Sequence, residues 1–273
     1  METKDLRKKL EAVLEALGEK EAPECRDYIE NLFIGDDELL YDDPYTIANT
    51  LLQRDKPDDL PKVIRNLIEE LFTAAYEAGN GDAMNDIGAQ YYDGSRGFDQ
   101  DFTKAVNCYK LAAAKGSRQA QENLGYCYYY GRNMPVDYEK AFHYFALGAF
   151  DGHLISLYKI GDMYRNGYYV EKNEVEAFHI YSRCLETMSD EAAPIVAGPV
   201  FLRVGSAFLN GTGTEADPKK ALICFQKAEA FLYDMVAGGN VMYKKSLQAA
   251  IDGQAEARAK LTEALPKQEW TFE

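Results

Sequence analysis

The sequence predicts an all-α protein, a right-handed α/α superhelix or solenoid of antiparallel helix pairs. The prediction depends on three series of small residues that share one period through the middle of the chain. Within each series the spacings are about 36 residues, with one longer interval of 44 at the end. A fixed internal period of this size is the signature of stacked helical repeats. The series are Gly88, Gly125, Gly161 and Gly205, then Gly94, Gly131, Gly167 and Gly211, and finally Ala105, Ala141, Ala177 and Ala221.

The first helix of each unit is predicted from apolar residues at helical spacing. In the first copy Ala83, Ile87 and Tyr91 are four residues apart and share one helix face, and the pattern recurs in the next three copies. A glycine inside a helix costs about 1 kcal/mol relative to alanine. Recurrence of Gly88 and its counterparts therefore predicts that a neighbouring helix packs closely there. The later glycine of each unit, Gly94 in the first copy, lies just beyond the helix, where a positive φ is favoured.

The second helix of each unit is predicted to begin after an Asp or Asn residue four positions before the repeat alanine. These residue types are favoured helix N-caps. Within the helix each repeat alanine is followed four residues later by an aromatic residue, as in Ala105 and Tyr109. A small residue facing a ring lets the two helices of a unit interlock. The predicted N-caps are Asp101, Asp137, Asn173 and Asp217.

Taken together, the pattern is A-x3-[ILV]-G-x2-[YF]-x2-G, a loop, and D-x2-[KE]-A-x3-[YF]. It resembles the Sel-1-like repeat, a relative of the tetratricopeptide repeat. The copies run over 79–115, 116–151, 152–187 and 199–233. One departure is Glu176, which stands where the pattern has a basic residue. An insertion is expected near 188–198, where Pro194 and Pro199 argue against one uninterrupted helix.

The repeats are predicted to be flanked by capping regions, because terminal units of an array need a polar outer surface. Residues 1–78 are expected to form an acidic helical cap with a degenerate unit, whose last helix covers about 60–72. Residues 234–273 are expected to form C-terminal capping helices and a tail, with Pro266 as a helix stop.

Charge and composition bear on the possible partners and compartment. The formal net charge is −15, which disfavours nucleic acid as a partner. No apolar run approaches the roughly 18 residues needed to span a membrane, so no membrane partner is expected. The N-terminal leucines follow an amphipathic pattern that does not resemble a secretory signal, so either the chain is cytoplasmic or a leader has been removed. The five cysteines lack metal-type spacing and are expected to be reduced thiols.

No catalytic, cofactor-binding or metal-binding residue is predicted, and the chain is not expected to be an enzyme. The histidines His143, His153 and His179 are not placed beside a plausible nucleophile or in a metal motif. The string from Ser156 to Lys159 fits S-x-x-K, but Ser156 occupies the small-residue position of the repeat. A small core residue explains it without chemistry.

A partner-binding stripe is predicted on the first helices, on the side away from the glycine face. By resemblance to tetratricopeptide arrays, this stripe should line a concave groove that takes a peptide. Tyrosine offers a broad contact surface at low entropic cost, and Arg165 can pair with a carboxylate. The candidate residues are Asn85, Tyr92, Glu122, Tyr126, Tyr129, Tyr158, Asp162 and Arg165.

The predicted function is that of a scaffold or adaptor that binds a peptide or a partner protein. Several alternatives stay open at this point. The tyrosines could pack against one another, or the partner could use the convex face, the loops or the N-terminal cap. A few relatives of the repeat family are linked to hydrolase activity, so an enzyme-like or small-ligand-binding protein is a second possibility. A dedicated regulator of one partner is a third.

Overall fold

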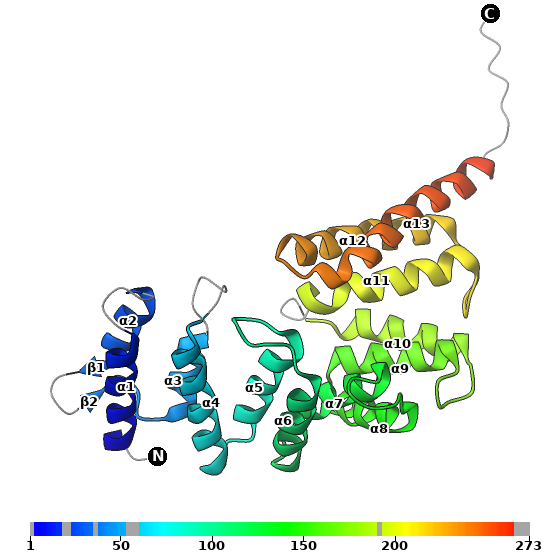
Figure 1. Ribbon diagram of the computed structural model, residues 1–273. Helices are drawn as coiled ribbons and strands as arrows, with labels where there is room; N and C mark the ends of the chain where they lie inside the picture. Colours follow the sequence, from blue (N-terminus) through cyan, green and yellow to red (C-terminus); the bar gives the residue numbers. More distant parts are fainter. Residues whose placement is uncertain (1–2, 18–22, 35–37, 53–59, 190–192, 265–273) are drawn as a thin grey trace, which may run out of the picture. The chain divides into compact units, whose positions relative to one another are not determined.

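The computed structural model describes residues 3–17, 23–34, 38–52, 60–189 and 193–264. It divides into two compact units, residues 1–141 and 142–273, and the boundary falls inside one helix, α8. The described chain is all-α, with sequential antiparallel helix pairs, except for one very short hairpin (Figure 1). The predicted right-handed sense of the superhelix stays a prediction.

The first unit begins with a small helical region. Helix α1 (Thr3–Leu17) buries Leu6, Leu10 and Leu17 completely or nearly so, as its amphipathic pattern predicts. Helix α2 (Pro23–Glu30) is followed by strands β1 (Phe33–Ile34) and β2 (Glu38–Leu39), which pair antiparallel. Two residues per strand are too few to show a period-two pattern, so sequence reasoning did not find this hairpin.

The rest of the first unit is a succession of helices. Helix α3 (Pro44–Leu52) packs against α4 (Lys62–Glu77), and α5 (Asp82–Asp93) packs against α6 (Phe102–Ala114). Helix α7 (Arg118–Tyr130) follows, and α8 (Tyr138–Phe150) begins in this unit. Asp101 caps α6 by accepting hydrogen bonds from the backbone N–H groups of Thr103 and Lys104.

The second unit continues the same arrangement with longer helices toward its end. Helix α9 (Leu154–Asn166) pairs with α10 (Glu174–Thr187), and α11 (Ala193–Asn210) pairs with α12 (Pro218–Ala237). A 3-10 turn, η1 (Val241–Tyr243), leads into α13 (Lys244–Glu263). Tyr181, Val200 and Val204 belong to the core cluster of this unit, which joins α9, α10, α11 and α12.

The repeat glycines lie where helices approach closely, as predicted. A Cβ atom added to Gly88 would lie 2.8 Å from Cε1 of Tyr109, and one added to Gly161 would lie 2.6 Å from Cε1 of Tyr181. In both cases the ring belongs to the second helix of the same pair, four residues after the repeat alanine. The later glycines adopt the left-handed conformation at helix C-termini, for example φ 63° at Gly94.

The chain is not helical at Met188 and Ser189, inside the expected insertion, but the two prolines themselves do not end helix α11. Helix α11 runs through Pro199, and Pro194 is its second residue, where no intrahelical N–H bond is needed. Pro199 removes only the bond to the carbonyl of Ile195, whose side chain is 54% exposed, so water can reach this turn. The additional turns of α11 pack on α12, because a Cβ atom on Gly198 would lie 2.8 Å from Cγ of Leu232.

Two further predictions can be placed on the described chain. Residues 244–263 form one capping-region helix, α13, while Pro266 and the tail lie outside the described residues. In the part of the chain that the structure describes, none of the helices combines the length and the apolarity that crossing a membrane requires.

Candidate functional site

Polar contacts join the first helices of successive pairs at one recurring sequence position. This position directly precedes the apolar core residue of each first helix, and it holds Asp86, Asn123 and Arg203 in α5, α7 and α11. Asp86 accepts a 2.9 Å hydrogen bond from the hydroxyl of Tyr45 in α3. Asn123 donates a 2.9 Å hydrogen bond to the side-chain oxygen of Asn85 in α5. Each side chain therefore reaches back to an earlier helix of its own unit.

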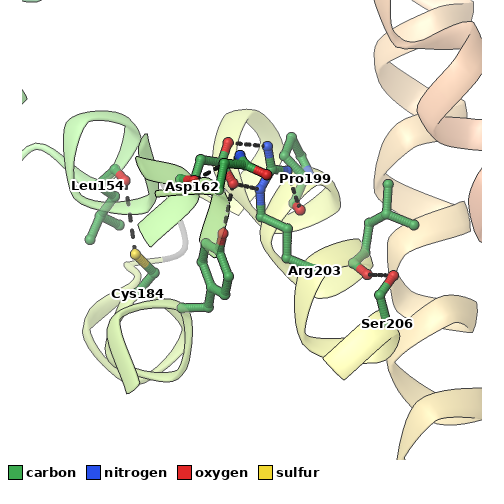
Figure 2. Close-up of polar contacts among 9 residues, drawn as sticks. Leu154, Asp162, Cys184, Pro199, Arg203 and Ser206 are labelled. Carbon is green, nitrogen blue, oxygen red and sulfur yellow. Dashed lines mark hydrogen bonds and ion pairs between the residues drawn. The ribbon is translucent and has the colours of Figure 1, made fainter. Parts of the chain in front are cut away.

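The strongest of these contacts is a bidentate ion pair between α9 and α11 (Figure 2). Nε of Arg203 lies 2.5 Å from Oδ1 of Asp162, and Nη2 lies 2.6 Å from Oδ2. The third guanidinium nitrogen donates to the backbone carbonyl of Pro199 at 2.8 Å. The hydroxyl of Tyr181 donates to Oδ1 of Asp162 at 2.7 Å, and the ring of Tyr158 lies 4.9 Å from the guanidinium carbon. This cluster connects α9, α10 and α11.

Burial and charge act in opposite directions on this ion pair. Burial alone would raise the pKa of Asp162, but the adjacent Arg203 guanidinium outweighs it and holds this pKa below its ordinary value. Burial would likewise lower the pKa of Arg203, and the Asp162 carboxylate raises it instead. Both groups are therefore charged at neutral pH. Each of the three Arg203 nitrogens donates a hydrogen bond and both Asp162 oxygens accept one, so the pair has a structural role in holding α11 on α9.

A second buried cation is Lys159, the lysine of the S-x-x-K string that sequence analysis considered for catalysis. Lys159 is 5% exposed, and burial lowers its pKa to about 8, with the Asp162 carboxylate opposing the shift. Ser156 is completely buried, which agrees with its interpretation as a small core residue.

A groove in the second unit is lined mainly by residues of the helices α9, α11 and α13. Its cavity has a volume of about 460 Å³, and its lining includes Arg165, Leu202, Ser206, Leu209, Asp252 and Glu256. A smaller neighbouring cavity of about 200 Å³ is lined by Arg165, Tyr181 and Arg203 among others. Arg165 therefore borders both spaces, at the last turn of α9.

An aromatic surface in the first unit surrounds the end of α7. We define it as Tyr92, Tyr126, Tyr129, Tyr130 and Arg132. The rings of Tyr126 and Tyr130 stack at 6.1 Å, and Tyr129 meets Tyr130 edge-on at 4.9 Å. The Arg132 guanidinium lies 5.7 Å from the centre of the Tyr130 ring and donates to the Tyr92 hydroxyl at 3.3 Å. Tyr130 is 47% exposed, and the other three tyrosines are half-buried.

The structure separates the eight predicted stripe residues into two groups. Four of them are buried at helix contacts, with exposed fractions between 3% and 7%: Asn85, Glu122, Tyr158 and Asp162. The other four are accessible, namely Tyr92, Tyr126 and Tyr129 in the aromatic surface of the first unit and Arg165 in the groove of the second. A binding role for the stripe stays a prediction, and it can involve directly only this second group.

Sequence reasoning missed Arg132, Arg203 and the carboxylates of α13 that line the groove. Arg203 could have been found, because a polar residue precedes the apolar core residue in every first helix of the repeat. The α13 residues had no such signal, since their place beside α11 is set by packing. Here Gly253 lets α13 approach the ring of Phe225, to which an added Cβ would come within 2.6 Å.

Comparison with known families identifies the repeated unit. The profile of the Sel1 repeat matches four segments, 81–117, 118–153, 154–183 and 202–230. The chain is a Sel1-like repeat protein. The four matched segments overlap the four units predicted from the glycine and alanine series.

Several proteins carry similar Sel1 repeats. Protein sel-1 homolog 2 of Mus musculus is 33% identical over 150 residues, which is 55% of this chain and 21% of that protein. The ERAD-associated E3 ubiquitin-protein ligase component HRD3B of Arabidopsis thaliana is 39% identical over 75 residues, 28% of this chain and 12% of that protein. The chain thus spans about a fifth or less of the length of these relatives.

Solved structures of Sel1 repeat proteins share the fold. A Sel1 repeat protein from Oxalobacter formigenes superimposes with a TM-score of 0.54 at 21% identity, over 75% of this chain and 78% of that one. The protective antigen c5321 of uropathogenic Escherichia coli superimposes with a TM-score of 0.51 at 16% identity, over 92% of this chain and 56% of that one. At these identities the likeness concerns the fold alone.

Proposed function

We propose that this Sel1-like repeat protein is a scaffold or adaptor that binds a partner protein. The observation that carries the proposal is the aromatic surface at the end of α7. Tyrosine and arginine are enriched at the centres of protein interfaces, because they bury a large area and still offer polar groups to the partner. Here three tyrosines of α7 are accessible, and the Arg132 guanidinium packs on the ring of one of them, Tyr130.

The relatives support this proposal through the roles their names state. HRD3B is by name a component of an E3 ubiquitin-protein ligase, and the segment similar to this chain belongs to that component. A component of an assembly must contact other proteins, and repeat arrays supply extended surfaces for such contacts. We extend this role, and no particular partner, to the present chain.

We further infer a binding role without catalysis, in a reducing compartment such as the cytoplasm. Ser156 of the S-x-x-K string is inaccessible to a substrate because it is completely buried. The cysteines whose side chains are described, Cys108, Cys127, Cys184 and Cys224, are free thiols, which is typical of reducing compartments.

The test is affinity capture from native lysate with the wild-type chain and with the double variant Tyr126→Ala/Tyr129→Ala. We expect the variant to lose the proteins that the wild type retains, while its thermal midpoint falls only slightly, because both tyrosines are half-buried and pack mainly on other rings. Tyr233→Ala is a matched control, since Tyr233 is 62% exposed in the second unit. Identical capture by wild type and double variant would contradict the assignment of this surface.

A further inference from the structure

The groove of the second unit contains a cation that forms no direct ion pair with a carboxylate of the described residues. Arg165 is exposed and borders both cavities, and within the described residues it forms neither a hydrogen bond nor an ion pair through its side chain. In a chain with 45 acidic residues, an arginine in a cavity without a carboxylate partner is available to an acidic group from outside. Its neighbour Arg203 is already paired with Asp162, so Arg165 is the arginine of the groove that is available to such a group.

The opposite wall of the same groove carries negative charge. Asp252 and Glu256 of α13 line the cavity one helical turn apart. Asp252 accepts a hydrogen bond from Gln248, and Glu256 lies 3.6 Å from Lys260 at the protein surface. Both carboxylates keep acceptor capacity for a further cation, because an ionised carboxylate has about four lone-pair sites.

Between the two charged walls lies α11, which contributes two leucines, a hydroxyl, the Asn210 amide and the already paired Arg203. Leu202 and Leu209 line the cavity, and Ser206 lies between them. The hydroxyl of Ser206 donates to the carbonyl of Leu202 at 2.9 Å (Figure 2). A cavity of about 460 Å³ whose floor includes Leu202 and Leu209 accommodates a few side chains of an extended segment.

We propose that this groove binds an extended peptide segment of a partner protein that has an acidic side chain, an apolar residue and a basic side chain in succession. The acidic side chain pairs with Arg165, and the basic one with Asp252 and Glu256. Because charged walls lie on both sides of this floor, the segment crosses the groove, and its carboxylate comes from an internal Asp or Glu. This inference rests on the proposed binding function and names the chemistry of the partner.

The test begins with a library of random short peptides displayed as fusions and selected on the full chain. We expect the selected peptides to be enriched in one acidic and one basic residue around an apolar one. A selected peptide, synthesised with an amidated C-terminus and a fluorescent label, is then titrated by anisotropy. Arg165→Glu should weaken its binding about tenfold or more, the loss expected when an interaction with a charged group is removed. A peptide in which the acidic residue is replaced by lysine should bind the Arg165→Glu variant. The same peptide should not bind the wild type more tightly than the original peptide does.

Arg183→Gln is the matched control, because Arg183 is an exposed arginine of α10 outside the groove. It should bind the peptide as the wild type does, and both Arg165→Glu and Arg183→Gln should unfold at the wild-type temperature. If no peptide is selected, or if the peptides bind equally to Arg165→Glu, the inference is wrong. Binding that requires a free C-terminus would also overturn it. The proposed function has its own test. It is contradicted if the Tyr126→Ala/Tyr129→Ala variant captures the same proteins from lysate as the wild type does.

Discussion

At the scale of single residues, the central feature is a charge pair in the core of the second unit. Two charges removed from water pay a desolvation cost that their attraction offsets only when the geometry is good and the remaining polar atoms are bonded. Asp162 and Arg203 meet this condition, because the pair is bidentate and Tyr181 and the Pro199 carbonyl take up further capacity. The pair thus fixes α11 on α9 in one position.

We expect either partner to be costly to remove alone. Asp162→Ala leaves the buried Arg203 guanidinium without its counter-charge, and Arg203→Met leaves the Asp162 carboxylate uncompensated. Each change should lower the free energy of unfolding by about 3–5 kcal/mol. In the double variant the free energy of unfolding should fall by clearly less than the two single losses added together, because neither charge is left unpaired. Urea denaturation of the four proteins measures this, and additive losses would show that the two side chains are not coupled.

The same pair predicts a pH dependence in acid. The pKa of Asp162 is lowered in the folded chain, so its stabilising contribution is complete above the ordinary carboxyl pKa of about 4. The contribution is lost as pH falls below that value and through the lowered pKa. The difference in unfolding free energy between wild type and Asp162→Asn should therefore shrink below pH 4. A difference that is constant from pH 6 down to pH 2 contradicts this account.

At the scale of elements, each helix pair depends on a glycine in one helix and a ring in the other. The spacing of residues predicted this contact, since a glycine kept in a helix interior at one repeat position requires a reason. What the spacing could not specify was the partner atom. In the structure the ring four residues after the repeat alanine covers the glycine, as Tyr109 covers Gly88.

Gly88→Ala should therefore destabilise the chain, although alanine is the better helix former by about 1 kcal/mol. The new methyl group would lie 2.8 Å from the Tyr109 ring and 3.1 Å from Cβ of Cys108, both too close for the packing to stay as it is. Overpacking of this kind costs about 1–3 kcal/mol. Combining Gly88→Ala with Tyr109→Leu should relieve the clash. The double variant should therefore lose less unfolding free energy than the two single variants lose in total. Thermal and urea unfolding of all three variants decide the matter; a gain in stability for Gly88→Ala alone would exclude a tight contact.

Helix α11 shows where element-level reasoning is unsafe. Two prolines within a few residues predicted an interruption, yet the helix continues through Pro199. One proline removes one backbone hydrogen bond, a local cost of about 3 kcal/mol. Packing of the added turns against α12, where Leu232 covers Gly198, offsets that cost, and such packing between helices is not visible in the local sequence.

At the scale of the whole molecule, buried thiols in both units contribute to the response to alkali, together with buried tyrosines such as Tyr109 and Tyr181 whose pKa values burial also raises. Burial raises the pKa of Cys127 and of Cys184 to about 12. The unfolded thiols lose their protons first as pH rises, so the folded state loses stability from about pH 9 upward, through the folded pKa. Lys159 has the opposite effect, because its pKa is lowered in the folded state. Between pH 8 and the ordinary lysine pKa near 10.4, its contribution to the unfolding free energy rises with pH.

We therefore expect the unfolding free energy of the chain to fall above pH 9, by up to about 1.4 kcal/mol per pH unit for each buried thiol. Cys127→Ala should show a shallower fall than the wild type, whatever its stability at pH 7. Lys159→Met should show a steeper one between pH 8 and 10, since it lacks the opposing contribution. Urea denaturation from pH 7 to 11 measures all three slopes. Parallel pH profiles for wild type and Cys127→Ala would contradict the assignment of this response to the thiol.

The repeat, its period, the N-caps such as Asp101, and the glycines at which helices approach could all be predicted from the sequence, because each is a short-range requirement of residue type and spacing. The sequence named the stripe residues as one set and did not separate the accessible members, such as Tyr126 and Arg165, from the buried ones. The tertiary structure was needed to show that Asp162 is a buried partner of Arg203 and that α13 supplies the acidic wall of the groove. These features depend on contacts between helices far apart in the chain, and a pattern within one helix cannot show which side of it another helix will cover.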